Sequence, residues 1–280
     1  MLHSNHILVL GGTGKTGRKI VSQLQQQGHK VRIGSRGATP SFDWDQPENW
    51  ENVLDTIDTI YITYQPDLAV PGALESIELL IKQAKFSGVR KVVLLSGKGE
   101  REAELCEQVV IHSGLAYTII RASWFFQNFS ESFMLEPILN GVVALPQAHV
   151  KIPFVDTGDI AEVAVKALTS NEHNGNIYEL TGSRTLTFKE AIATIAKTTQ
   201  RDIKFIPISI QAYCEAMQEQ GVPEDFVWLI GYLFTHVLGN PEVSNITNDV
   251  HKVLGRPATD FAQYVKQTAN TGVWNVQVNA

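Results

Sequence analysis

Residues 8–19 read LVLGGTGKTGRK, and their glycines and cations are of the kind that binds phosphate. Gly14-Lys15-Thr16 matches the end of a P-loop, which would predict a nucleoside-triphosphate site. A P-loop also needs a glycine five residues before Gly14, but Val9 occupies that position. The later predicted strands do not end in the aspartate that orders magnesium in such sites. The sequence therefore argues against an ATPase or kinase loop.

The same glycines fit a dinucleotide-binding turn. Gly11 and Gly12 permit a sharp turn, Gly14 allows close approach of a pyrophosphate, and Gly17 lets the following helix pack closely. An apolar strand precedes the turn and an amphipathic helix follows it, as this motif requires; a merely structural turn is the alternative. We expect the whole turn to contact the cofactor: Gly11, Gly12, Thr13, Gly14, Lys15, Thr16 and Gly17.

The choice of cofactor depends on the end of the second predicted strand, IGSRG. NAD sites usually carry an Asp or Glu there for the ribose hydroxyls, and this chain has none. Ser35 and Arg36 suit a 2′-phosphate instead, since a guanidinium binds phosphate through two hydrogen bonds. The sequence therefore favours NADPH over NADH, unless Arg36 is a solvated loop charge.

The segment FDWDQPENW, residues 42–50, lies where a third strand should pass the adenine. Asp43 is placed to accept from the adenine amino group, and Trp44 to pack near the ring. Ordinary core packing of Trp44 and Trp50 is the equal alternative.

At the reacting end, no tyrosine is followed four residues later by a lysine, the proton-donating pair of most short-chain dehydrogenases. Tyr117 precedes Arg121 by four residues, but on a strand these are about 13 Å apart. Ser96, at the end of a central predicted strand, is the remaining candidate for contact with substrate or nicotinamide. Serine is also a common turn residue.

An aromatic segment, WFFQNF, follows the strand at 116–122. Its faces suit a flat or cationic substrate, although packing between lobes is the alternative and is favoured for Phe126. We expect the substrate pocket to include Trp124, Phe125, Asn128, Pro153 and Phe154. Asp156 and Asp159 are expected to be structural, Asp159 as a cap or first-turn acid of a helix.

The elements that must position these residues alternate between strands and helices, the pattern of a doubly wound α/β fold. Strands are expected at 6–10, 30–35, 58–63, 90–96, 116–122 and 177–182. Helices at 17–28, 72–88 and 103–114 each end in glycine just before a strand. We expect a parallel-sheet Rossmann domain at 1–123 and 150–182, with a smaller, mostly helical substrate-binding lobe at 124–149 and 183–280.

The composition of the chain excludes several classes of partner. The net charge of −6, with scattered Lys and Arg, argues against nucleic acid. Two distant cysteines, Cys106 and Cys214, predict reduced thiols rather than a disulfide framework. The histidines lack metal-ligand spacing, and the apolar N-terminal run is too short for a signal or membrane segment. We expect a cytoplasmic, metal-free monomer or homodimer that acts on a small molecule.

Several linked motifs resemble those of the NmrA-like, atypical short-chain dehydrogenase/reductase family. They span nearly the whole chain and include SFDWDQPENW, VVLLSG, YTIIRASWFFQNF, KIPFVDTGDIAEVAVKAL and VLGRPATDFAQYV. Within the family, GGTGKT, SFDW, VPEDFVWL and GVW are most similar to the ergot-alkaloid type, festuclavine dehydrogenase-like reductases. The resemblance implies an NAD(P)-binding Rossmann domain under a variable C-terminal lobe, with no Tyr-x-x-x-Lys pair.

The predicted function is an NADPH-dependent oxidoreductase that delivers hydride to a small imine, enone or quinone-like substrate. Such substrates need mainly hydride, whereas the alkoxide formed from a ketone needs a positioned proton donor. The family that the chain resembles also contains regulators that bind NAD(P) without turnover and act through a protein partner. That is the alternative.

Overall fold

The computed structural model describes residues 6–276, and the chain divides into two compact units. Unit 1 comprises residues up to 122, 157–180 and 252–255. Unit 2 comprises 123–156, 181–251 and the residues from 256 onward. No helix within residues 6–276 is both long and apolar enough to cross a membrane.

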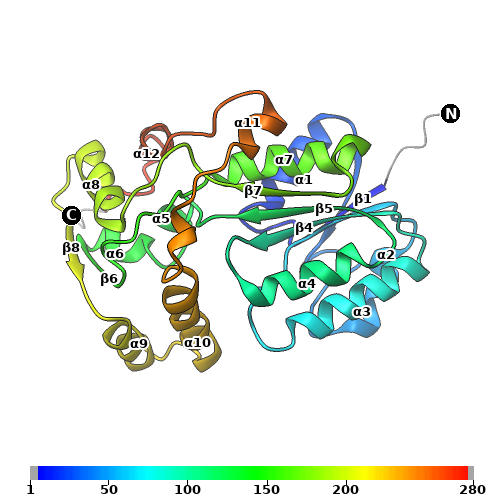
Figure 1. Cartoon of the computed structure of the whole chain (residues 1–280), viewed down its shortest axis with the longest axis horizontal. Helices are drawn as coiled ribbons and strands as arrows, with labels where there is room; N and C mark the ends of the chain where they lie inside the picture. The colour runs from blue at the N-terminus through cyan, green and yellow to red at the C-terminus, as the bar shows by residue number, and fades with distance from the viewer. Residues whose placement is uncertain (1–5, 277–280) are drawn as a thin grey trace. The chain divides into compact units, whose positions relative to one another are not determined.

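The sheet of unit 1 has six parallel strands in the order β2-β1-β3-β4-β5-β7 (Figure 1). They are β1 (His6–Leu10), β2 (Lys30–Gly34), β3 (Thr59–Ile62), β4 (Lys91–Gly97), β5 (Ala116–Ala122) and β7 (Asn176–Leu180). The connections reverse direction between β1 and β3, and α/β folds bind ligands at the carboxyl ends of strands at such a point. The predicted doubly wound Rossmann architecture is confirmed.

Helices cover both faces of this sheet (Figure 1). One face carries α1 (Gly17–Gln26) and α7 (Thr157–Thr169); the other carries α2 (Trp50–Leu54), α3 (Ala73–Phe86) and α4 (Arg101–Ile111). Gly28, Gly88 and Gly114 follow α1, α3 and α4 with φ of 80°, 90° and 80°. Only glycine adopts that conformation without strain, which is why the sequence marks these helix ends so clearly.

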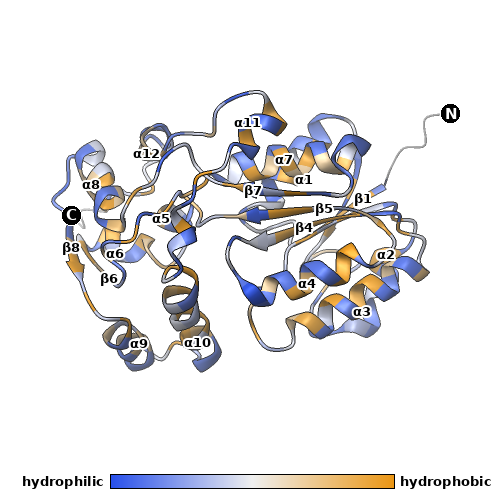
Figure 2. Cartoon of the chain, viewed as in Figure 1, coloured by the Kyte–Doolittle hydropathy of each residue, from blue (hydrophilic) through white to orange (hydrophobic). Residues whose placement is uncertain are grey.

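Burial on both faces explains the apolar strands of unit 1. Figure 2 shows largely hydrophobic strands between helices that carry both hydrophobic and hydrophilic residues. Lys91 is a polar exception at 7% exposed, and its Nζ donates to the carbonyls of Ala167 and Ser170 at 3.2 and 2.7 Å. It thereby satisfies carbonyls at the C-terminal end of α7, where a cation is favourable.

Unit 2 is mostly helical. Its helices are α5 (Asn128–Glu131), α6 (Leu135–Leu139), α8 (Phe188–Thr199), α9 (Ile210–Glu219), α10 (Glu224–Tyr232) and α12 (Phe261–Ala269). A π-helical turn, Leu233–Val237, continues α10, and α11 (Asp249–Leu254) runs from unit 2 into unit 1. A small parallel sheet pairs β6 (Val142–Leu145) with β8 (Lys204–Pro207).

Two segments differ from the sequence-based expectation. Residues 42–50 form no strand; they run as a loop into a 3₁₀ turn, Pro47–Asn49, because the side chains of Phe42 and Trp50 pack into the core of unit 1. Residues 150–156, expected in the Rossmann domain, group with unit 2. Ile152 bridges to Leu186, and Phe154 packs in the core of unit 2.

Candidate functional site

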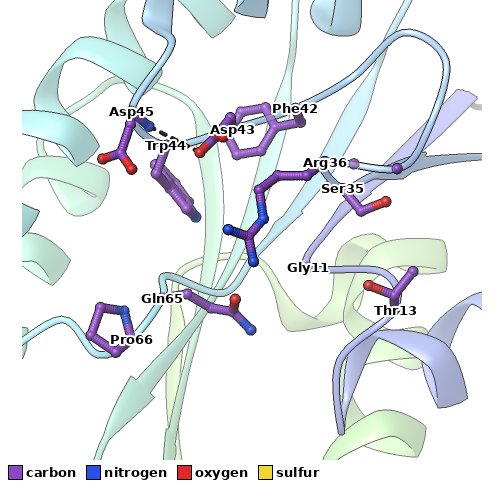
Figure 3. Close-up of a pocket in the computed structure, with 12 residues that line it drawn as sticks. Gly11, Thr13, Ser35, Arg36, Phe42, Asp43, Trp44, Asp45, Gln65 and Pro66 are labelled. Carbon is purple, nitrogen blue, oxygen red and sulfur yellow. Dashed lines mark hydrogen bonds between the residues drawn. The ribbon is translucent and has the colours of Figure 1, made fainter. Parts of the chain in front are cut away.

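A pocket of about 810 Å³ opens in unit 1 at the carboxyl ends of β1, β2 and β3 (Figure 3). Six of the predicted cofactor residues line it: Gly11, Thr13, Ser35, Arg36, Asp43 and Trp44. Gly12, Gly14, Lys15, Thr16 and Gly17 do not line it. The pocket thus joins the glycine turn, the end of β2 and the segment expected near the adenine in one cavity.

The glycine turn is built from close backbone contacts. Gly11 has a φ of 67°, and the N–H of Gly14 donates to its carbonyl at 2.9 Å. A Cβ on Gly17 would stand 2.1 Å from the same carbonyl oxygen, so only glycine lets α1 begin there. The N-terminal end of α1, where the helix dipole favours an anion, is thereby placed beside the turn. This arrangement fits the pyrophosphate of a dinucleotide.

Backbone hydrogen bonds shape the corner after β2. The carbonyl of Ser35 accepts from the N–H groups of Ala38 and Phe42 at 3.1 and 3.0 Å, and Ser41 Oγ donates to the carbonyl of Arg36. The Arg36 side chain extends into the pocket (Figure 3). Within residues 6–276 its guanidinium has no hydrogen-bond or ion-pair partner, so its charge is available to a ligand.

Aromatic rings form a second wall of the pocket. Trp44 packs against Tyr64 with ring centroids 4.6 Å apart, while Phe42 stacks on the buried Trp50. Trp50 Nε1 donates to the carbonyl of Asp43 at 2.6 Å and so fixes the backbone at the predicted adenine position. Trp50 is therefore a core anchor, whereas Trp44 and Asp43 border the cavity.

Sequence reasoning missed other lining residues: Gly34, Gly37, Phe42, Asp45, Gln65 and Pro66. Gln65 and Pro66 follow β3, which lies next to β1 in the sheet. Residues after neighbouring parallel strands share one edge, and that rule was the signal available for them.

Thr16 lies away from the cavity and is only 3% exposed. It accepts a hydrogen bond of 2.9 Å from the hydroxyl of Tyr61, a β3 residue that is fully buried. Burial raises the pKa of Tyr61, so the phenol remains protonated and keeps donating. The side chain of Thr16 therefore ties α1 to β3, which differs from the expected phosphate contact.

The Tyr61→Phe variant tests this structural role. Loss of one buried hydrogen bond should lower the free energy of unfolding by about 1 kcal/mol and leave dinucleotide affinity unchanged. Urea unfolding and a dinucleotide titration measure the two quantities. Tyr117→Phe is the matched control, because the Tyr117 hydroxyl has no hydrogen bond within residues 6–276. A weaker dinucleotide affinity for Tyr61→Phe alone would contradict a purely structural Tyr61–Thr16 contact.

The hydroxyl of Ser96 also makes a buried hydrogen bond within the protein. It is 4% exposed and donates at 2.6 Å to Oε1 of Glu107, which lies on α4 and is fully buried. Arg121 of β5 donates to both carboxylate oxygens of Glu107, the shortest contact being 2.6 Å from Nη2 to Oε2. Because side chains alternate along a strand, Ser96 points to the α4 face with Val92 and Leu94. The expected contact with substrate or nicotinamide is replaced by this buried network.

The predicted substrate residues all lie in unit 2. Trp124 is half-buried and meets Phe188 and Phe234 edge-on. Phe154 is 1% exposed within the core of unit 2, so its ring serves packing rather than a pocket surface. Pro153 is buried, Phe125 and Asn128 are half-buried, and the backbone of Phe125 bridges to Val155.

A second, shallower pocket of about 600 Å³ lies wholly within unit 2. It is lined by residues 149–151, Thr185, 238–241 and 243–246, none of which was expected at a site. His149 and Lys151 are its basic members. Within residues 6–276, no group of three or more His, Cys, Asp or Glu side chains is arranged to hold a metal ion.

Several known proteins are similar to this chain over nearly its whole length. No family model matches the chain. The chain is 29% identical over 279 residues to prestalk A differentiation protein A of Dictyostelium discoideum, covering 94% of this chain and 92% of that protein. It is 29% identical to the NAD(P)H azoreductase of Xenophilus azovorans (94% and 98% covered) and 28% identical to the agroclavine dehydrogenase of Claviceps fusiformis (96% and 98%).

These matches confirm the resemblance to the NmrA-like, atypical short-chain dehydrogenase/reductases. The fold agrees with that of an NADPH-dependent quinone oxidoreductase from Escherichia coli solved with NADPH, with a TM-score of 0.80 at 18% identity. That match covers 94% of this chain and 100% of that one. The azoreductase and the agroclavine dehydrogenase are named as oxidoreductases, which agrees with the predicted class of enzyme and does not favour the non-catalytic regulator.

Proposed function

We propose that this chain is an NADPH-dependent reductase of a small imine, enone or quinone-like organic molecule. The observation that carries the proposal is the unit 1 pocket, in which the glycine turn and the unpartnered guanidinium of Arg36 line one cavity. The turn suits the pyrophosphate, and Arg36 with Ser35 suits a 2′-phosphate. A bound dinucleotide supplies the hydride.

Charge in the pocket supports NADPH over NADH. No carboxylate follows β2 at the position where an NAD site would hold the ribose hydroxyls; Ser35 and Arg36 occupy it. Asp43 and Asp45 line the same cavity, and the carboxylate of Asp43 accepts from the N–H of Asp45 at 3.2 Å (Figure 3). Arg36 is the cation of this lining, and its guanidinium suits the extra phosphate of NADPH.

The candidate proton donors near the reacting end support the proposed class of substrate. The sequence has no Tyr-x-x-x-Lys pair, and the Ser96 hydroxyl is engaged by Glu107. An iminium, an activated enone or a quinone is reduced mainly by hydride, and water can supply the remaining proton. The azoreductase, dehydrogenase and quinone oxidoreductase among the similar proteins have names consistent with such chemistry.

Equilibrium titrations followed by turnover assays test the proposal. Nicotinamide fluorescence should give a dissociation constant for NADPH at least about tenfold below that for NADH, since the 2′-phosphate adds charged hydrogen bonds. Absorbance should then report NADPH oxidation with at least one imine, enone or quinone. Equal affinities would refute the 2′-phosphate site. Tight NADP⁺ binding without turnover on all three classes would favour the regulator instead.

A further inference from the structure

The pocket of unit 2 lies between two stretches of chain that are far apart in the sequence. One wall is the segment 149–151 after β6, together with Thr185. The other wall is most of 238–246, between the π-helical turn and α11. All of these residues belong to unit 2, whereas the dinucleotide pocket lies in unit 1. The two pockets therefore share no residue.

Hydrogen bonds within unit 2 hold the two walls in place. Ile152 and Leu186 exchange two backbone hydrogen bonds of 2.9 Å. This bridge fixes the segments that carry Lys151 and Thr185. Ser244 Oγ of the second wall donates to the carbonyl of Lys151 at 2.6 Å, so the two walls are joined directly. The pocket is thus defined by the protein's own bonds, before any ligand is present.

The π-helical turn shapes the start of the second wall. Gly239 follows this turn, and a Cβ there would stand 2.1 Å from the carbonyl oxygen of Thr235, so only glycine fits. Gln147 Nε2 donates at 2.9 Å to the carbonyl of Phe234 within the turn. Short π-helical turns are rare and are frequently found at functional sites. An uncommon backbone turn is therefore fastened beside this pocket.

The polar side chains of the pocket are basic or neutral. His149 and Lys151 are exposed, and neither side chain has a hydrogen-bond or ion-pair partner within residues 6–276. In the same range the hydroxyl of Thr185 and the side-chain amide of Asn245 also make no hydrogen bond. The described residues that line the pocket include no acidic side chain. These groups are therefore available to donate hydrogen bonds to one anion.

Two acids lie near the pocket without lining it. The N–H and hydroxyl of Thr187 are the main causes that lower the pKa of Glu190, and Lys151 adds a smaller contribution. Glu190 is bound in the capping box of α8, so it does not form an ion pair with this lysine. Glu242 lies on the 3₁₀ turn Pro241–Ser244 between two lining residues, but it does not line the cavity. The ammonium group of Lys151 thus remains available to a ligand.

Apolar side chains form the rest of the lining: Val150, Leu238, Pro241, Val243 and Ile246. Leu238 and Val243 belong to the core of unit 2, whereas Ile246 is 49% exposed. The volume of about 600 Å³ is within the range of sites for small organic molecules. A ligand with one negative group on an apolar body matches both parts of the lining.

We infer that this pocket is a second ligand site, which binds a small organic carboxylate. Its carboxylate pairs with Lys151, and its hydrocarbon body packs on Val243 and Ile246. A carboxylate suits the site better than inorganic phosphate does, because the described lining provides one lysine and an apolar surface that phosphate would leave in water. The site goes beyond the proposed dinucleotide reaction and does not depend on it.

Equilibrium dialysis of the full chain with 2-naphthoate, followed by the fluorescence of this probe, tests the site. We expect a dissociation constant of about 1 mM or lower, as for other ligands of this size. Lys151→Gln should raise that constant at least about fivefold, since a charged hydrogen bond is lost. Lys204→Gln, the same change at an exposed lysine of β8 outside the pocket, should stay within about twofold of the unmodified protein.

A steric variant tests the location independently of charge. Ile246→Trp fills the cavity from an exposed position and should weaken 2-naphthoate binding at least about fivefold. Ile206→Trp is the matched control, because Ile206 is 45% exposed on β8 and does not line the pocket. Its affinity should equal that of the unmodified protein. Circular dichroism should show that all four variants are folded.

Three results would overturn the inference. The first is that the unmodified protein does not bind 2-naphthoate, and the second is that Lys151→Gln and Ile246→Trp bind it as tightly as the unmodified protein does. The third is displacement of 2-naphthoate by an equal concentration of inorganic phosphate, which would make the pocket a phosphate site instead. The NADPH and NADH titrations test the proposed function separately, so failure of one proposal is distinguishable from failure of the other.

Discussion

Replacement of Glu107 by alanine is expected to lower the free energy of unfolding by about 3 kcal/mol. The Glu107 side chain is completely buried and accepts hydrogen bonds from Ser96 and Arg121. Without it, the guanidinium of Arg121, whose side chain is 19% exposed, loses its close partner, and a buried hydroxyl is left unpaired. Oε1 of Glu104 and Oε1 of Glu179 each lie 3.6 Å from Nη1 of Arg121. These two carboxylates remain near the guanidinium and limit the loss of stability to about this value. Urea denaturation followed by circular dichroism measures it.

Two matched variants show whether the burial of Glu107 causes this loss of stability. Glu104→Ala removes a carboxylate from the same arginine, but its side chain is 47% exposed, and such pairs contribute only about 0–1 kcal/mol. Glu107→Gln keeps the shape and one acceptor, so its loss should fall between the two alanine variants. Equal stability of Glu107→Ala and Glu104→Ala would contradict the assignment of a buried network.

Arg36→Ala is expected to raise the dissociation constant for NADPH about 10- to 100-fold while changing that for NADH little. A charged hydrogen bond contributes about 1.5–3 kcal/mol, and only NADPH carries the 2′-phosphate that would receive it. Because the Arg36 guanidinium has no hydrogen-bond or ion-pair partner within residues 6–276, removing it breaks no internal hydrogen bond or ion pair. Fluorescence titration with both dinucleotides measures the selectivity directly.

Arg90→Ala is the control for a general loss of positive charge. Arg90 is also an exposed arginine of unit 1, but it lies before β4, at the opposite end of the sheet, and pairs with Asp58 at 2.6 Å. Its removal should leave both dinucleotide affinities unchanged. An unaltered NADPH preference in Arg36→Ala would show that another group contacts the 2′-phosphate.

The strands of the Rossmann domain were predictable for two reasons. A strand that is buried on both faces is a run of apolar residues, and a glycine marks the end of the helix before several of these strands. The predicted ranges 6–10 and 116–122 coincide with β1 and β5, and the other four differ by at most two residues at either end. Residues 42–50 were less predictable, since their aromatic content suits both a strand and a packed loop. There the deciding factor is tertiary: Trp50 bonds to the Asp43 carbonyl across seven residues.

At the site, residue type alone was a weaker guide than side-chain direction. Ser96 stands at the carboxyl end of a central strand, as predicted, but alternation along β4 points its hydroxyl toward Glu107. The hydrogen bonds of Glu107 to Ser96 and Arg121 were not predicted, because the three residues lie on α4, β4 and β5 and meet only when these elements pack together. Spacing along the chain does not reveal such contacts.

The discontinuity of unit 1 has a consequence for the order in which this protein forms during synthesis. Its edge strand β7 ends at Leu180, after 34 residues of unit 2 have been made, and its last segment is 252–255. Lys166 Nζ donates at 2.8 Å to the carbonyl of Val253 in that segment. A ribosome must therefore translate the chain as far as residue 255 before unit 1 acquires all its contacts, so that a nascent chain stalled earlier exposes an incomplete unit 1 to chaperones and proteases.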